Sequence, residues 1–281
     1  MSAELIRLIL DFGNLIIVSA NVVIGSSLFL YVSTHNLRSS VARAFCALLA
    51  CSTLVYVVDI SMTEVATSSA AAGWLRLQWV GIAFMPAAYL HFSDALLRTT
   101  GAHSRSRRIS VSAGYLLGCF VLTLTLFTDL IVGGVEQVDQ IFHLTAGPYF
   151  WVFALYYVII TVDGWSNISR ARSRCLAPTS RRRMSYLMLA FAAPAAGVFP
   201  YLLIPSMSRQ LSPNMISGMA LGGNLAVAAM TGVIGYIVAY QGVLLPDRVV
   251  KHTLLHYLLR GPLVAILVVV IMLTVPRVEP I

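Results

Sequence analysis

Residues 9–33, ILDFGNLIIVSANVVIGSSLFLYVS, form an apolar run in which Asp11 is the only charged side chain. A helix needs about 20 predominantly apolar residues to cross a bilayer, so this run is long enough for one span. It is longer than the apolar core of a signal peptide and lacks a convincing small-residue cleavage site. The sequence therefore predicts an uncleaved first membrane span.

Further apolar runs of similar length follow along the chain. They lie at about 43–62, 74–97, 109–130, 149–168, 184–205, 214–240 and 255–275. In lipid every backbone polar group must be paired within its span, and none of the runs alternates as an outer-membrane strand does. We therefore expect an all-α fold, a polytopic transmembrane helix bundle with seven or eight spans. The last run is the weakest, because Arg260 interrupts it and Val275-Pro276 closes it.

Fifteen of the nineteen basic residues lie in alternate gaps between these runs. The four gaps contain Arg38 and Arg43; Arg98, Arg105, Arg107 and Arg108; Arg170, Arg172, Arg174, Arg181, Arg182 and Arg183; and Arg248, Lys251 and Arg260. Short loops rich in Arg or Lys stay in the cytoplasm during insertion. We therefore expect the amino terminus to lie outside, together with the gaps 63–73, 131–148 and 206–213. The gap 131–148 contains Glu136 and Asp139 and no Lys or Arg.

The composition supports a membrane protein without a soluble domain. The 281 residues are 58% hydrophobic and 11% charged, with a mean hydropathy of +0.83, whereas soluble domains are about a quarter charged. The net charge of +8 does not indicate a nucleic-acid partner, because the arginines flank apolar spans at the level of anionic headgroups. We divide the chain into a bundle at 1–245 and a segment at 246–281, which holds an interfacial stretch and the eighth run.

Polar side chains inside spans are costly and call for a functional hypothesis. Concave sites between helices, with a few converging polar groups, are the usual form of ligand pockets. We expect an outward-facing ligand site lined by Asp59, Trp74, Gln78, Trp151 and Tyr201. The alternative is an aromatic belt at the membrane surface together with interhelical hydrogen bonds. Such bonds are also the expected role of three deeper residues, Asn14, Asn21 and Asn224.

Other in-span residues suggest ion pairing or bending. At the cytoplasmic side, His91, Asp94 and Asp163 are expected to take part in ion pairing with arginines such as Arg98 or Arg170. The alternative for the acids is a role in transport. Proline removes a backbone donor and kinks a helix, so the hinge candidates are Pro86, Pro194 and Pro200.

No enzyme or cofactor signature is present. The chain has no HExxH, P-loop or GxSxG motif, so we expect no catalytic residue. The sole lysine, Lys251, lies in a basic loop, where it cannot hold retinal, and of the two intramembrane histidines that a buried haem needs only His91 is available. His252 and His256 share a helix face but lack a third ligand. We therefore expect no cofactor and no metal. The four cysteines, Cys46, Cys51, Cys119 and Cys175, imply no disulfide framework.

Several motifs occur in a recognisable order. WLRLQWVGIAFMP at 74–86 is followed by HFSDALL at 91–97, GPYFW at 147–151 precedes Tyr156-Tyr157, Arg181–Arg183 leads to Pro194 and Tyr201, and Leu211-Ser-Pro213 precedes the seventh run. Over about residues 9–245 this order resembles the amino-terminal seven-transmembrane sensor region of bacterial histidine kinases. The tail LPDRVVKH at 245–252 is similar to a linker in kinases that carry further modules.

The resemblance implies a sensory function in the bacterial inner membrane. Such a domain would detect an extracytoplasmic or membrane-borne signal and relay it by helix repacking to a cytoplasmic effector such as a histidine kinase. The expected partners are the lipid bilayer, the effector or kinase module and, as one option, a second copy in a homodimer. Neither a phosphoacceptor histidine box nor an ATP-binding box is present, so a kinase module would have to follow in the full gene product.

Two other function classes stay open at this point. A small-molecule transporter or channel would show saturable uptake into vesicles, lost on Asp94→Asn. A non-catalytic subunit of a membrane complex would co-purify with other membrane proteins at fixed stoichiometry.

Overall fold

The computed structural model of the protein describes residues 3–35, 37–63, 65, 67–138, 141–190 and 212–240. Several expectations therefore lie outside the described residues. These are the part of the sixth run beyond Ala190, the unit 246–281 with its eighth run, the hinge candidates Pro194 and Pro200, and the site candidate Tyr201.

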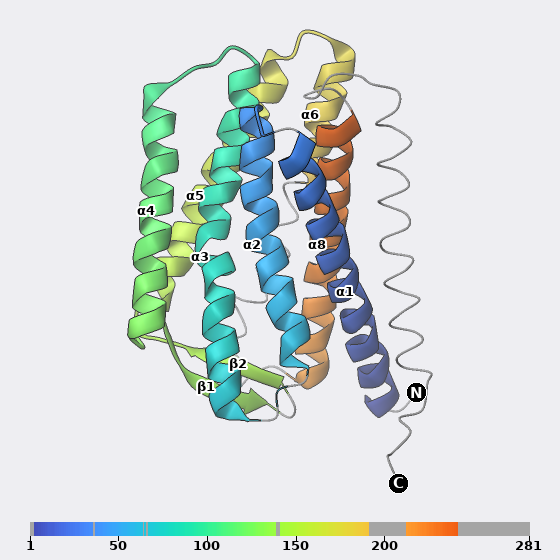
Figure 1. Cartoon of the computed structure of the whole chain (residues 1–281), viewed down its shortest axis with the longest axis vertical. Coiled ribbons are helices and arrows are strands. Elements are labelled where there is room, and N and C mark those ends of the chain that lie inside the picture. The colour runs from blue at the N-terminus through green and yellow to red at the C-terminus, as the bar shows by residue number, and fades with distance from the viewer. Residues whose placement is uncertain are drawn as a thin grey trace.

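The expected all-α bundle is confirmed (Figure 1). The described helices are α1 (Ala3–His35), α2 (Ser40–Met62), α3 (Ser68–Thr99), α4 (Arg105–Phe127), α5 (Phe150–Arg174), α6 (Pro178–Ala190) and α8 (Pro213–Tyr240). Each overlaps one of the apolar runs of the sequence. Helix–helix packing around an apolar core is the expected outcome when no run has the period of a strand.

Five of the described helices are long and apolar enough to cross a membrane. The five segments are the whole of α2, α3 and α4, together with Ile6–Thr34 within α1 and Asn214–Tyr236 within α8. Helix α5 has sufficient length, but Asp163 and Asn167 lower its mean hydropathy, and α6 is described over 13 residues only. The expected count of seven or eight spans is therefore not confirmed.

A β-hairpin that the sequence analysis did not anticipate joins α4 to α5. Strands β1 (Val132–Val138) and β2 (Ile141–Ala146) pair antiparallel, with Val135 opposite Leu144 and Glu136 opposite His143. The register is irregular between Val132 and Val135, where two glycines follow one another. The signal was two short stretches rich in β-branched residues on either side of a polar pair, which is typical of a hairpin.

Side-chain caps set where three of the helices begin. Ser39, Thr67 and Ser104 precede α2, α3 and α4, and each side chain accepts a hydrogen bond from the backbone N–H three residues later. A hydroxyl at this position satisfies one of the backbone donors left free at a helix start. These three residues therefore fix the boundaries between the loops and the helices of the first half of the bundle.

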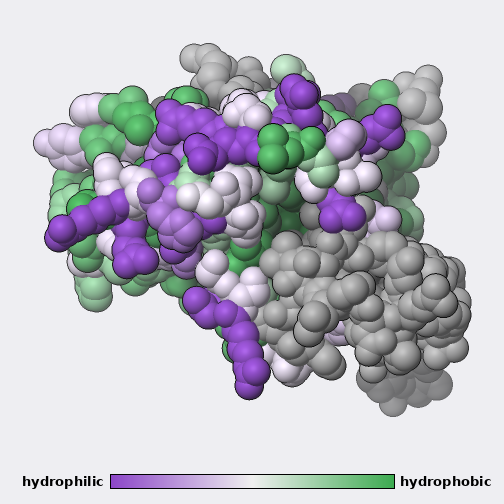
Figure 2. Space-filling model, turned by 90° about the horizontal axis from the view of Figure 1, so that it is seen from above, coloured by the Kyte–Doolittle hydropathy of each residue, from purple (hydrophilic) through white to green (hydrophobic). Residues whose placement is uncertain are grey.

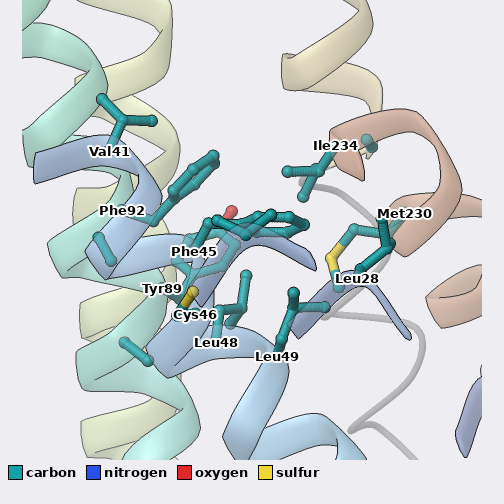
Figure 3. Packing of buried hydrophobic residues seen from close by; sticks show 14 of the residues in the cluster. Leu28, Val41, Phe45, Cys46, Leu48, Leu49, Tyr89, Phe92, Met230 and Ile234 are labelled. Carbon is teal, nitrogen blue, oxygen red and sulfur yellow. The ribbon is translucent and has the colours of Figure 1, made fainter. Parts of the chain in front are cut away.

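Helix α3 is the central element. Most of it is buried, and it contacts α2, α4, α5 and both strands of the hairpin. On the other side of α2, α1 packs against both α2 and α8. Figure 3 shows the apolar core between these helices, where Phe45 and Leu49 of α2 lie between Phe92 of α3 on one side and Leu28 and Met230 on the other.

Small residues bring α3 and α4 close together. Gly114 and Gly118 stand four apart on α4, opposite Ala87 and Ala83 on α3. A Cβ atom at Gly118 would lie 2.9 Å from Phe84 Cδ1 and 3.0 Å from the Ala83 carbonyl oxygen. Such pairs of small residues, four apart, let helix backbones approach each other in membranes.

The two ends of the bundle carry different elements (Figure 1). The hairpin end carries β1, β2 and the start of α3, and the arginine end carries the α1–α2, α3–α4 and α5–α6 connections. The described part of the arginine end contains twelve arginines, namely Arg38, Arg43, Arg98, Arg105, Arg107, Arg108, Arg170, Arg172, Arg174, Arg181, Arg182 and Arg183. Figure 2, a view onto this end, shows hydrophilic side chains gathered over the bundle.

Candidate ligand site at the hairpin end

The structure brings two of the expected site residues into direct contact. The Gln78 side chain on α3 donates a hydrogen bond from Nε2 to Asp59 Oδ1 on α2, and the same nitrogen lies 3.4 Å from the Val55 carbonyl oxygen. Gln78 is buried and Asp59 is partly buried. A carboxylate and an amide at one point between two helices can offer both acceptors and donors to a polar ligand.

An aromatic cluster lies beside this pair. It consists of Trp79, Phe150, Phe153, Tyr156 and Tyr157, which come from α3 and α5. The Trp79 and Phe153 rings meet edge to face with centroids 4.8 Å apart, and the Trp79 and Phe150 centroids are 6.4 Å apart. Trp79 follows Gln78 directly in the chain, so the polar pair and the aromatic cluster share one turn of α3.

The hairpin covers the aromatic cluster from the end of the bundle. Ile131, Val132 and Leu144 are buried in the same apolar cluster as Trp79. Near the start of α3, Arg76 pairs with Asp129 at 2.8 Å and donates to the Leu126 carbonyl oxygen at 3.2 Å, which ties α3 to the end of α4. The polar pair and the aromatic cluster therefore lie under a short β-structure.

The two other described members of the expected pocket, Trp74 and Trp151, are exposed. Trp151 is 61% exposed, because the helical period turns its neighbours Phe150 and Phe153 inward and leaves Trp151 on the outer face of α5. Trp74 is 38% exposed in the first two turns of α3. Trp79, 4% exposed, takes the buried aromatic position instead.

Sequence reasoning missed Trp79, although a signal for it was present. Trp79 and Ala83 lie one helical turn apart, with Ile82 between them on the same face. That apolar stripe could have identified Trp79 as the buried tryptophan. Trp74 and Trp151 were chosen instead, because they lie near the ends of apolar runs, where the membrane surface is expected.

At the arginine end, Asp94 is enclosed by basic side chains. Arg98 Nε lies 3.1 Å from Asp94 Oδ2, and Arg107 Nε donates to Asp94 Oδ1 at 3.0 Å. The carboxylate is 3% exposed, and Arg107 also donates to the Ala102 carbonyl oxygen. These contacts join the end of α3 to the start of α4 through the connecting turn.

The two other residues expected to take part in ion pairing lie differently. His91 Nδ1 is 3.2 Å from the Tyr115 hydroxyl of α4, and the two rings meet edge to face, so its contact is with a neutral group. Within the described part of the chain, Asp163 makes no ion pair with Arg170 or any other arginine. Asp163 and Arg170 stand seven residues apart, which is about 10.5 Å along a helix.

The hinge candidate Pro86 lies inside α3, and the helix continues through it to Thr99. Proline cannot donate to the carbonyl four residues earlier, which is that of Ile82. One residue further on, the Ala83 carbonyl oxygen lies 3.5 Å from the Tyr156 hydroxyl, which also donates to the Gly114 carbonyl oxygen at 3.0 Å. Tyr156 thereby connects α5 to both α3 and α4 near the proline.

The deeper polar residues lie between the first and last described helices. Asn14 and Asn21 of α1 each hydrogen-bond a residue of α8, and Asn224 of α8 donates to Asn14. Among the described residues, no three His, Cys, Asp or Glu side chains gather to hold a metal ion. The chemistry of the described bundle is therefore that of hydrogen bonds, one enclosed carboxylate and aromatic faces.

Comparison with known proteins identifies the family. Residues 16–232 match the family model described as the N-terminal 7TM region of histidine kinase. No curated protein matches the chain. The region that the family model describes is a non-catalytic membrane domain of histidine kinases, in keeping with the helices found here. Because the match covers most of the chain, from within α1 to within α8, this protein belongs to the family of N-terminal seven-transmembrane sensor regions of histidine kinases.

Proposed function

We propose that this domain detects a signal at its hairpin end and relays it by helix repacking to a kinase module at its arginine end. The observation that carries the proposal is the hydrogen-bonded Asp59–Gln78 pair beside the aromatic cluster. The same helix that contributes Gln78 and Trp79 ends in the Asp94 ion pairs, about 24 Å further along the helix axis. A change at one end of α3 therefore has a direct route to the other.

The orientation follows from charge. The described arginine end holds twelve arginines, whereas the described hairpin end holds two, Arg7 and Arg76. Loops enriched in arginine are retained on the cytoplasmic side during insertion. In this orientation the amino terminus and the hairpin lie outside the inner membrane, and the ion pairs of Asp94 face the kinase.

The site suits a ligand or a membrane component that combines a polar group with an apolar body. Asp59 and Gln78 would exchange their mutual hydrogen bond for bonds to the ligand, and Trp79 and Phe150 would supply apolar contact. The shift can be no larger than the difference in affinity between the two states of the bundle. Sliding of packed helices by about 1–2 Å is the usual form of such a change.

The test is a fusion in which residues 1–281 precede the catalytic module of a histidine kinase that drives a transcriptional reporter. Asp59→Asn removes the charge of the interhelical pair and Gln78→Leu removes its donor, and each is expected to change the basal output of the kinase several-fold. Asp163→Asn is the matched control, because it also neutralises an in-span carboxylate but leaves the hairpin end intact. Unchanged output in both site variants, at equal amounts of membrane-inserted protein, would refute the proposal.

A further inference from the structure

The first and last described helices are joined by a repeated polar contact. Asn14 Nδ2 donates to the Ser217 carbonyl oxygen at 2.9 Å, and seven residues later Asn21 Nδ2 donates to the Asn224 carbonyl oxygen at 3.1 Å. Asn224 Nδ2 in turn donates to Asn14 Oδ1 at 3.2 Å. Since both numbers increase together, α1 and α8 run parallel. A seven-residue repeat is the spacing at which two helices keep the same faces together.

Apolar contact extends the same seam toward the arginine end. A Cβ atom at Gly235 would meet Leu28 Cδ1 at 2.7 Å, about two helical turns beyond Asn21 on α1 and about three turns beyond Asn224 on α8. At the hairpin end the Ser217 hydroxyl donates to Asp11 Oδ1 at 2.8 Å. Polar residues at the seam of paired helices specify one register over its neighbours. The axial position of α8 is therefore tied to that of α1.

Asn21 also faces α2. The Tyr56 hydroxyl of α2 lies against the Asn21 side chain, and Tyr56 is one helical turn from Asp59 on the same helix. Asn21 is 4% exposed, and its Oδ1 atom accepts no hydrogen bond of normal geometry from any described residue. A buried amide oxygen without a donor favours any rearrangement that supplies one.

These contacts place five polar groups in sequence across four helices. Gln78 of α3 bonds Asp59 of α2, Tyr56 of α2 lies beside Asn21 of α1, and Asn21 bonds Asn224 of α8. The series begins at the candidate site and ends on the helix within which the family match closes. Both Asn21 and Asn224 lie in the membrane interior, where a polar group without a partner is costly.

We propose that Asn21 is a positioning residue that couples the Asp59–Gln78 pair to α8. This inference rests on the proposed function and names the route by which the site acts. Rearrangement at Asp59 moves Tyr56 relative to Asn21. The Asn21 Oδ1 atom then accepts a hydrogen bond from the Tyr56 hydroxyl. The Asn21 amide group rotates as a result, and its Nδ2 atom carries the bond to the Asn224 carbonyl oxygen with it. Helix α8 then shifts against the rest of the bundle.

The experiment measures where α8 lies. Spin labels are placed at the exposed positions Ser106 of α4 and Tyr236 of α8, both at the arginine end, in a full chain whose four native cysteines are replaced. The distance distribution between the labels is recorded by pulsed electron paramagnetic resonance in lipid nanodiscs. Asp59→Asn serves as the perturbation of the site, and it is expected to shift the mean distance by about 1–2 Å.

The coupling is tested by combining Asp59→Asn with a second substitution and measuring the same distance. The shift caused by Asp59→Asn is expected to disappear in Asn21→Leu and in Tyr56→Phe, the second of which removes a single oxygen atom and preserves packing. It is expected to persist in the control Asn167→Leu. Asn167 is also a buried asparagine with an unpartnered Oδ1 atom and one interhelical bond, to Ser93, but it lies on α5, away from the series.

Each outcome decides the matter. Loss of the shift in Asn21→Leu and Tyr56→Phe, with retention in Asn167→Leu, supports the coupling role. Persistence of the shift in Asn21→Leu or Tyr56→Phe overturns that role and leaves the proposed function intact. Absence of any shift on Asp59→Asn in the parent chain also overturns it. In that last case the reporter output of the kinase fusion shows separately whether sensing at the hairpin end fails as well.

Discussion

At the scale of single residues, the contrast between Asp94 and Asp129 shows how burial governs the value of an ion pair. Asp94 is 3% exposed and pairs with two arginines, whereas Asp129 is 71% exposed and pairs with one. Removing one partner of a buried pair leaves the remaining charge without compensation. Exposed pairs are screened by solvent and contribute little.

Asp94→Asn is therefore expected to destabilise the protein by about 3 kcal/mol, the lower end of the range for breaking a buried pair, because Arg98 and Arg107 are partly exposed. Asp129→Asn, the matched control, is expected to cost less than about 1 kcal/mol. Thermal unfolding in detergent measures both. Equal melting temperatures for the two variants would contradict the assigned role of Asp94.

At the scale of elements, close approach of helices depends on where side chains are absent. The Gly114 and Gly118 face of α4 meets the Ala83 and Ala87 face of α3, and the Tyr156 hydroxyl of α5 donates to the Gly114 carbonyl oxygen. At Gly118 this packing leaves no room for one more carbon atom. It also brings α3, α4 and α5 together around Pro86, beneath the aromatic cluster.

Gly118→Ala is expected to destabilise the bundle by about 1–3 kcal/mol through overpacking against Phe84 and the Ala83 carbonyl. The control is Gly222→Ala on α8, where a Cβ atom would meet nothing within 4 Å. That change should be neutral or slightly stabilising, because alanine favours helix more than glycine does. The melting temperatures of the two variants in detergent test the difference. A Gly118→Ala variant as stable as the parent would show that the interface can relax.

At the scale of the whole molecule, the described helices form one bundle with the arginines at one end and the hairpin at the other. The direction in which that bundle crosses the membrane decides which end faces the cytoplasm. A homodimer remains a prediction from the sequence, as does the unit 246–281.

The orientation predicts which positions a membrane-impermeant thiol reagent reaches. In a chain without its native cysteines, Gln137→Cys in the hairpin is expected to react in intact cells, and Ser180→Cys at the start of α6 only after the membrane is permeabilised. The reason is retention of arginine-rich loops in the cytoplasm. Labelling of Ser180→Cys but not Gln137→Cys in intact cells would invert the molecule and remove the proposed outward-facing site.

The sequence by itself determined the class of fold and the separation of charge. Long apolar runs predict helices, because the backbone polar groups of a span must be paired within the lipid. Arginines in alternate gaps mark one end of the bundle, because arginine-rich loops stay on the cytoplasmic side. The sequence also indicated Asp59 and Gln78 as two members of one expected site. The tertiary structure decided which aromatic residues join them: the phase of α5 buries Phe153 and exposes Trp151. The same holds for the contact of Asn21 with both α2 and α8, because pairing between helices distant in the chain depends on how their faces pack, which local periodicity does not encode.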